Sequence, residues 1–173
     1  MFEKVSSQGH FSELEARKVL TQIARGIEYL HSKGICHRDI KPENILCTDE
    51  PEDYRVVISD FGLSKFYGRG ELMSTSCGTA HYAAPEIYMN RPYDEACDMW
   101  SYGAVAYVLL TGSFPFATTT REPLANVICS GKFNRRNLQI RHVSEPGLFH
   151  IHSSFHACLL IICVIYLNSC AFH

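Results

Sequence analysis

Three short polar sequences, in a fixed order along the chain, carry the side chains that could do chemistry. They are HRDIKPEN at residues 37–44, DFG at residues 60–62 and APE at residues 84–86. Asp39, Asn44 and Asp60 bring carboxylate and amide oxygens, which are hard ligands of the kind that Mg²⁺ prefers. The same residue types are also common in turns between strands. For an isolated Asp or Asn we would favour the turn interpretation. The order and spacing of the three sequences therefore decide between a functional role and a turn.

Taken together, the three sequences resemble the signature set of serine/threonine protein kinases. DFG alone is weak evidence, but a chance match to all three in the right order is very improbable. The resemblance implies transfer of the γ-phosphate of ATP to serine or threonine of a protein substrate, with ATP and Mg²⁺ as cofactors. It makes Asp39 the catalytic aspartate that orients the hydroxyl and accepts its proton, and Lys41 the support of the transferring phosphate. Asn44 and Asp60 then hold Mg²⁺, and with Lys41 they contact the nucleotide.

The resemblance also assigns regulatory residues to the loop between DFG and APE. Arg38 is expected to pair with a phosphorylated residue of this loop, through charge-assisted hydrogen bonds. Thr75 stands where calmodulin-dependent kinases place their activating threonine, and Ser74 and Ser76 are the second choices. An unmodified polar loop is the alternative. Thr79 matches the threonine that contacts the catalytic aspartate and lysine.

Two acidic residues match structural positions of the family. Asp98 begins a D-x-W-S-x-G sequence at residues 98–103, where the family's aspartate braces the HRD backbone. A helix-surface acid is the alternative, but the surrounding helix is apolar almost all round, and a buried unpaired carboxylate is costly. Glu86, in APE, matches a glutamate that pairs with a distant arginine. Glu43 matches a carboxylate that reads basic residues upstream of the target residue, with a solvated surface acid as an almost equal alternative.

The elements around these motifs are predicted to be mainly helical with small β-hairpins. Ser12 and Glu15 form a capping box that opens a helix over residues 12–33. Two short strands are expected around residues 44–47 and 55–59, and a long functional loop over residues 63–83. A buried helix is predicted over residues 95–110 and another near residues 121–131. With the motifs, these elements resemble the C-terminal lobe of a protein kinase.

Composition restricts the other functional classes. The chain of 173 residues has 16 basic and 18 acidic side chains, so no nucleic-acid footprint is expected. The N-terminus lacks the apolar core of a signal peptide. The 8 cysteines have no CxxC spacing, and they favour reduced thiols in the cytoplasm or nucleus.

The resemblance covers residues 1–133, which are predicted to be a partial kinase domain. The opening MFEKVSSQGHFSELEA resembles a segment of the calcium/calmodulin-dependent group. The chain contains no G-x-G-x-x-G-x-V loop and no V-A-I-K lysine, so we expect the N-terminal lobe to be absent. That lobe covers the phosphates and supplies an essential Lys–Glu pair. We therefore expect no appreciable kinase activity from this polypeptide alone. The alternative is a truncated, non-catalytic kinase that acts as a protein-binding module.

Residues 134–173 form an atypical tail with no recognisable domain. The tail contains no D-P-x-x-R sequence, so we expect Glu86 to lack its partner. The apolar run at residues 157–167 falls short of the ~20 residues that span a membrane, which favours core packing or an aggregation-prone tail. The sequence sets no expectation for calmodulin, because any regulatory segment would lie in this unrelated region. The tail also offers zinc-capable ligands whose spacing fits no standard finger: His150, His152, His156, Cys158, Cys163 and Cys170.

Overall fold

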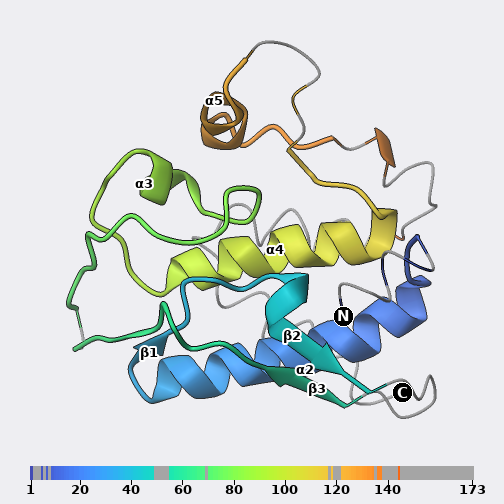
Figure 1. Ribbon diagram of the computed structural model, residues 1–173, viewed down its shortest axis with the longest axis horizontal. Coiled ribbons are helices and arrows are strands. Elements are labelled where there is room, and N and C mark those ends of the chain that lie inside the picture. The colour runs from blue at the N-terminus through green and yellow to red at the C-terminus, as the bar shows by residue number, and fades with distance from the viewer. Residues whose placement is uncertain are drawn as a thin grey trace.

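The computed structural model describes residues 1, 5, 7, 9–48, 55–68, 70–116, 118, 122–134, 136–137 and 144. The chain packs two long helices side by side, with short strands on one side and two short helices on the other (Figure 1). In chain order the elements are α2 (Glu13–Ser32), β1 (Ile35–Cys36), the 3-10 turn η1 (Pro42–Asn44), β2 (Ile45–Cys47), β3 (Val56–Ile58), β4 (Lys65–Phe66), α3 (Pro85–Tyr88), α4 (Ala96–Thr111) and α5 (Leu124–Cys129).

Helix α2 forms because its sequence combines a strong cap with one apolar face. The backbone N–H of Ser12 donates to Glu15 Oε2 at 2.9 Å, and the N–H of Glu15 donates to Ser12 Oγ at 3.3 Å. This capping box satisfies two amides that would otherwise lack partners at the helix start. The buried stripe follows helical spacing: Ala16, Val19, Leu20, Ile23, Ile27 and Leu30. The predicted helix over residues 12–33 is confirmed, with Ser12 and Lys33 as its caps.

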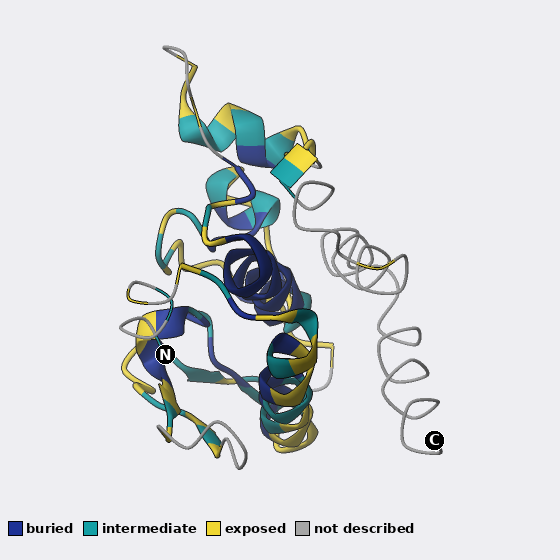
Figure 2. Ribbon diagram, turned by 90° about the vertical axis from the view of Figure 1, so that its right-hand side faces the viewer, coloured by how far each residue is buried: buried dark blue, intermediate teal, exposed yellow. Residues whose placement is uncertain are grey.

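Helix α4 is the centre of the fold. All its residues from Cys97 to Thr111 are buried, and Figure 2 shows the buried colour along the helix. It ends at Gly112, whose φ of 70° lies in the left-handed region. A Cβ at this position would stand 2.1 Å from the carbonyl oxygen of Gly9, so only glycine fits here. The buried helix predicted over residues 95–110 is confirmed within one residue at each end.

The strands form two small antiparallel pairs. Strand β2 pairs with β3 in the register Ile45↔Ile58, and β1 pairs with β4 in the register Ile35↔Phe66. The first pair confirms the two strands expected from β-branched residues. The second pair was not predicted, and β4 lies inside the segment expected to be loop. Strands of two residues carry almost no local signal, because their pairing depends on a partner distant in sequence.

The structure also adds the short helix α3, which follows directly after Ala84. Helix α5 lies inside the segment near residues 121–131 where a helix was expected. Within the described ranges, no helix is both long and apolar enough to cross a membrane. The apolar run at residues 157–167 and the histidine- and cysteine-rich tail lie outside the described residues.

Candidate active site

The candidate catalytic residues stand on the segment that joins β1 to β2. Burial of Ile40 fixes this segment against the core, and η1 turns the chain so that Asn44 is also buried. Arg38 has a φ of 67° and Asp60 a φ of 62°, so two non-glycine residues of the predicted site adopt the left-handed conformation. This conformation is uncommon outside glycine and is concentrated at functional sites.

Asp39 lies at the centre of a compact polar group, which we call the loop cluster: Asp39, Lys41, Asn44 and Thr79. Lys41 Nζ forms an ion pair with Asp39 Oδ2 at 2.7 Å. Thr79 Oγ1 donates to Asp39 Oδ1 at 2.7 Å and accepts from Lys41 Nζ at 2.8 Å. Asn44 Nδ2 donates to Asp39 Oδ2 at 3.1 Å and to the Asp39 carbonyl oxygen at 2.9 Å. Three side chains, from residues up to 40 positions away, therefore converge on the carboxylate of Asp39.

The loop cluster keeps Asp39 ionised. Burial alone would raise the pKa of this carboxyl group, because an apolar environment disfavours the charged form. The hydrogen bond and positive charge of Lys41, with the hydrogen bonds from Thr79 and Asn44, outweigh burial and lower the pKa. At neutral pH the group is therefore a carboxylate that can accept hydrogen bonds.

Asp60 is held close to Asn44 by the residue that precedes it. The backbone N–H and the hydroxyl of Ser59 both donate to the carbonyl oxygen of Asn44, at 2.8 and 3.0 Å. The Asp60 side chain is exposed, and its Oδ1 accepts from the N–H of Gly62 at 3.2 Å. The turns that carry Asn44 and Asp60 are thus neighbours. Their amide and carboxylate oxygens form a donor set that fits Mg²⁺, which binds proteins through few hard oxygen ligands.

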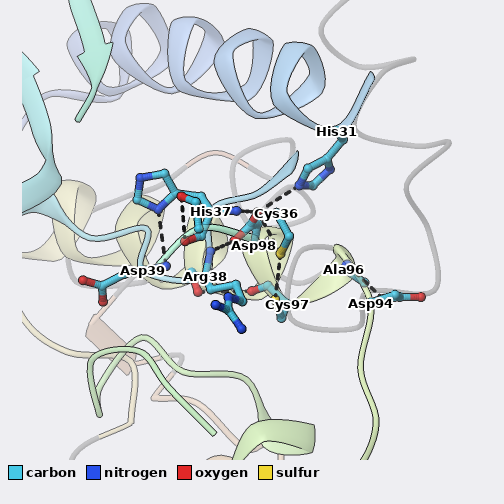
Figure 3. A network of polar contacts seen from close by, with 11 residues as sticks. His31, Cys36, His37, Arg38, Asp39, Asp94, Ala96, Cys97 and Asp98 are labelled. Atoms are coloured by element: carbon cyan, nitrogen blue, oxygen red, sulfur yellow. Dashed lines mark hydrogen bonds and ion pairs between the residues drawn. The ribbon is translucent and has the colours of Figure 1, made fainter. Parts of the chain in front are cut away.

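A second polar group lies behind the catalytic loop, at the first turn of α4. Asp98 is fully buried, and its two oxygens accept from backbone N–H groups of the HRD sequence. Oδ2 accepts from His37 at 2.8 Å and Oδ1 from Arg38 at 2.7 Å. Figure 3 shows these contacts, with the Asp39 side chain pointing away from them. Asp98 therefore fixes the backbone from which Asp39 extends.

Three more side chains complete this group, which we call the bracing cluster: His31, Cys36, Cys97 and Asp98. His31 Nε2 lies 2.9 Å from Asp98 Oδ2. The thiol of Cys36 donates to the same oxygen at 3.4 Å, and its sulfur lies 3.6 Å from that of Cys97. A hydrogen bond from Cys97 lowers the pKa of Cys36, but burial and the charge of Asp98 raise it by more. The hydrogen bond to Cys36, followed by burial, raises the pKa of Cys97, so both thiols are protonated at neutral pH.

Arg38 and Thr75 are connected through a tyrosine. The Arg38 guanidinium donates to the Leu63 carbonyl at 2.6 Å and to the Tyr93 hydroxyl at 3.3 Å. Tyr93 in turn donates to the Thr75 carbonyl at 2.7 Å, while Thr75 itself is exposed. The hydroxyl of Thr75 is therefore on an accessible loop whose backbone is tied to the neighbourhood of Arg38.

Glu86 stands at the start of α3 and is partly buried. Burial raises its pKa, and the nearby charge of Asp94 adds to the rise. Within the part of the chain that the structure describes, no cation forms an ion pair with Glu86. The arginines at positions 135 and 141 lie outside the described residues.

Comparison with known proteins agrees with this geometry. The model of the protein kinase domain matches residues 1–158, so the chain belongs to the protein kinase family. The match extends beyond residue 133, where we placed the domain boundary, and that boundary stays a prediction.

The similar proteins are serine/threonine kinases. A "Probable myosin light chain kinase" of Dictyostelium discoideum is 47% identical over 145 residues, which cover 84% of this chain and 42% of the relative. Human serine/threonine-protein kinase H1 is 41% identical over 136 residues, covering 78% of this chain and 32% of the relative. Calcium/calmodulin-dependent protein kinase type 1 of Macrobrachium nipponense is 41% identical over 147 residues, covering 85% of this chain and 42% of the relative. The chain is thus a serine/threonine protein kinase by family and resembles the calmodulin-dependent group, and it spans less than half the length of these curated relatives.

Sequence reasoning missed several residues that support the site. His31 is a partner of Asp98, and Tyr93 links Arg38 to the loop that carries Thr75, yet neither lies in a recognised motif. His37 also supports the site, since its ring packs edge-on against the ring of Phe61, with 5.1 Å between the centroids. No local sequence pattern around Cys36 or Cys97 indicates that the two sulfurs meet.

Proposed function

We propose that this chain is the catalytic C-terminal lobe of a serine/threonine protein kinase, which transfers the γ-phosphate of ATP to a hydroxyl of a protein substrate. The observation that carries the proposal is the loop cluster. Thr79 and Lys41 hold both oxygens of Asp39, and the neighbouring turn presents Asp60 beside Asn44. No packing requirement of a fold explains why three polar side chains converge on the carboxylate of Asp39.

In the proposed reaction, Asp39 accepts a hydrogen bond from the attacking hydroxyl and takes its proton as the hydroxyl oxygen bonds to the γ-phosphorus, while the bond from that phosphorus to the bridging oxygen breaks and ADP leaves. The interactions that keep Asp39 ionised before the reaction also fix its orientation. Lys41 lies 2.7 Å from the same carboxylate, so its ammonium stands where a transferring phosphate gains negative charge. A positioned base of this kind typically contributes about 10²–10⁴-fold to the rate.

Asn44 and Asp60 would hold Mg²⁺, through the amide oxygen of one and the carboxylate of the other. When bound, the metal supplies charge neutralisation at the phosphates. The protein's part is to keep the two oxygen donors on adjacent turns, which the Ser59 hydrogen bonds to Asn44 do. Asp98 contributes indirectly, since it fixes the backbone of the catalytic loop.

We also propose that the 173-residue polypeptide transfers phosphate slowly or not at all by itself. Its sequence contains neither the glycine-rich loop nor the lysine that, in the family, cover and clamp the phosphates. The second candidate is a non-catalytic kinase module that binds substrates or a full-length partner. Cytoplasmic or nuclear location is part of the proposal, and calmodulin regulation is left open.

Thr75 is the proposed activating phosphorylation site. Phosphorylation would place up to two negative charges on an exposed hydroxyl whose backbone is already tied, through Tyr93, to Arg38. Arg38 carries the guanidinium geometry that pairs well with phosphate.

The test uses the chain alone and a chimera in which the N-terminal part of the Dictyostelium relative precedes it. We expect Mg²⁺-dependent ATP hydrolysis or peptide phosphorylation only in the chimera, and loss of it in Asp39→Asn. Glu28→Gln is the matched control, because it changes an exposed acid on α2. A chimera that binds Mg²⁺–ATP but does not phosphorylate any peptide would favour the binding module. Phosphorylation by the chain alone at the family's usual turnover of about 1–100 per second would overturn the proposed inactivity.

A further inference from the structure

Two cysteine thiols and one carboxylate meet in the core behind the catalytic loop. Cys36 ends β1 and Cys97 lies in the first turn of α4, so the two sulfurs come from elements 61 positions apart. Cys36, Cys97 and Asp98 are 0%, 1% and 0% exposed, and their sulfur and oxygen atoms all lie within 4.8 Å of one another. Figure 3 shows the three side chains converging. Bracing of the catalytic loop requires Asp98, but it requires neither thiol.

The distances in this group resemble the edges of a metal-coordination tetrahedron. With Zn–S bonds of about 2.3 Å and a Zn–O bond of about 2.1 Å, a tetrahedral site has an S···S edge of about 3.8 Å and an S···O edge of about 3.6 Å. Two of the three observed edges agree, at 3.6 Å between the sulfurs and 3.4 Å between Cys36 Sγ and Asp98 Oδ2, and the third, from Cys97 Sγ to Asp98, is no longer than 4.8 Å. A disulfide needs a separation of about 2.0 Å. The arrangement is therefore much closer to a metal site than to a disulfide.

Charge balance also allows a divalent cation in this buried place. Without metal, the cluster holds two protonated thiols and one carboxylate. Binding a divalent cation releases the two thiol protons to solvent and forms two metal–thiolate bonds, so the net charge of the cluster does not change. Desolvating extra charge is the usual obstacle to an ion in a core, and this exchange avoids it.

An outer shell for such a metal is already in place. Ligating carboxylates are normally held by further hydrogen bonds, which orient them toward the metal. Asp98 Oδ2 is held by His31 Nε2 at 2.9 Å and by the His37 N–H at 2.8 Å, and Oδ1 by the Arg38 N–H. Both thiol protons would have to leave, and that of Cys36 is the one that donates to Oδ2.

We propose that Cys36, Cys97 and Asp98 form a binding site for a soft divalent cation of the zinc type. Thiolate ligands select zinc or cadmium over Mg²⁺, so this site is chemically distinct from the oxygen donors proposed for the nucleotide's metal. Three protein ligands leave one tetrahedral position for an exogenous ligand, and because the three residues are 0%, 1% and 0% exposed, that ligand would be a small buried one such as water. The bound ion joins β1 to α4 directly behind the HRD sequence. Its effect is to stabilise the backbone that carries Asp39, independently of catalysis.

The test uses the full 173-residue chain and cobalt or cadmium alone. Tail cysteines are first removed by a Cys158→Ser, Cys163→Ser, Cys170→Ser triple variant, which gives a background free of competing tail thiols. In this background, Cys36→Ser with Cys97→Ser removes the proposed ligands, and Cys129→Ser is the matched control at a free cysteine elsewhere. Because the ligands are buried, metal is added both during expression and in long incubations of the purified chain. Metal content and the thiolate-to-cobalt charge-transfer absorption are measured.

We expect about one thiolate-bound ion per background chain and per Cys129→Ser chain, and loss of its charge-transfer absorption in the double variant. X-ray absorption of the zinc-loaded background provides a measurement that does not depend on the folding of a variant. It should show two sulfurs at about 2.3 Å together with oxygen. Absence of thiolate-bound metal in the background, equal binding in the double variant, or a shell with no sulfur would overturn the proposal and leave a hydrogen-bonded thiol pair only. None of these outcomes depends on kinase activity, so failure here is separate from failure of the proposed function.

Discussion

The loop cluster and the bracing cluster lie on opposite sides of one short backbone segment, and they differ in burial and in what they connect. The loop cluster joins side chains around Asp39, and its lysine is 20% exposed. The bracing cluster joins a fully buried carboxylate to backbone N–H groups, and Asp98 has no exposed surface. The comparison teaches that the carboxylate of Asp39, which is 8% exposed, is kept in position by a second carboxylate that is fully buried. Substitutions in the two clusters should therefore affect different quantities.

Asp39→Asn should give the largest functional effect. In the chimera with an N-terminal kinase part, we expect phosphorylation of a peptide substrate to fall by about 10²–10⁴-fold, the usual contribution of a positioned base. The urea midpoint should change less than the activity, because asparagine keeps one side-chain oxygen that can accept from either Lys41 or Thr79. Steady-state kinetics and urea unfolding measure the two effects. An activity within a factor of two of the unsubstituted chimera would contradict the role assigned to Asp39.

Asp98→Ala should give the largest effect on stability. It leaves the buried N–H groups of His37 and Arg38 without acceptors, at about 1–3 kcal/mol each. We expect the free energy of unfolding to fall by about 2–6 kcal/mol, which is a large part of the roughly 5–15 kcal/mol typical of a domain. Urea denaturation followed by circular dichroism measures the change. Asp94→Ala, at an exposed acid near the start of the same helix, is the control, and equal losses in both variants would break the distinction between the clusters.

Thr79→Val should have a smaller effect that is specific to the loop cluster. The substitution keeps the shape of the side chain but removes the hydroxyl that bridges Asp39 and Lys41. A hydrogen bond to a charged group contributes about 1.5–3 kcal/mol, so we expect activity in the chimera to fall by about 13- to 160-fold. Ser76→Ala, in the same exposed loop, serves as the control. If Thr79→Val has no effect on kcat or KM, the bridge does not position Asp39.

The smallest expected effect is a change in how the stability of the chain depends on pH when Asp39, in the loop cluster, is replaced. The pKa of Asp39 is lower in the folded chain than in the unfolded chain, where it is about 3.9. The folded state therefore gains stability from Asp39 above that pH, and this gain is lost as the pH falls through the lower, folded pKa. Asp39→Asn should consequently lose less stability than the unsubstituted chain between neutral pH and about pH 3. Thermal unfolding at several pH values measures the difference, and parallel curves would contradict it.

Local sequence signals predicted the elements that depend on near neighbours. Ser12 and Glu15 sit three residues apart, so the start of α2 could be located from the capping box. The apolar character of residues 99–110 predicted that α4 is buried, and the β-branched residues predicted β3. The two-residue strands β1 and β4 could not be predicted, because each is defined by a partner about 30 residues away. The same limit applies to the site, where no local pattern indicates that His31 reaches Asp98 or that Tyr93 links Arg38 to Thr75.

The amino-acid sequence by itself determined which chemistry this protein carries, because HRDIKPEN, DFG and APE fix the identity and order of the carboxylates, lysine and amide. Only the tertiary structure decided how those groups meet. Contacts such as Thr79 with Asp39 and Cys36 with Cys97 join residues 40 and 61 positions apart. Their geometry is set by the packing of α2 and α4 and by burial of Asp98, and packing is a property of the whole chain rather than of any local segment.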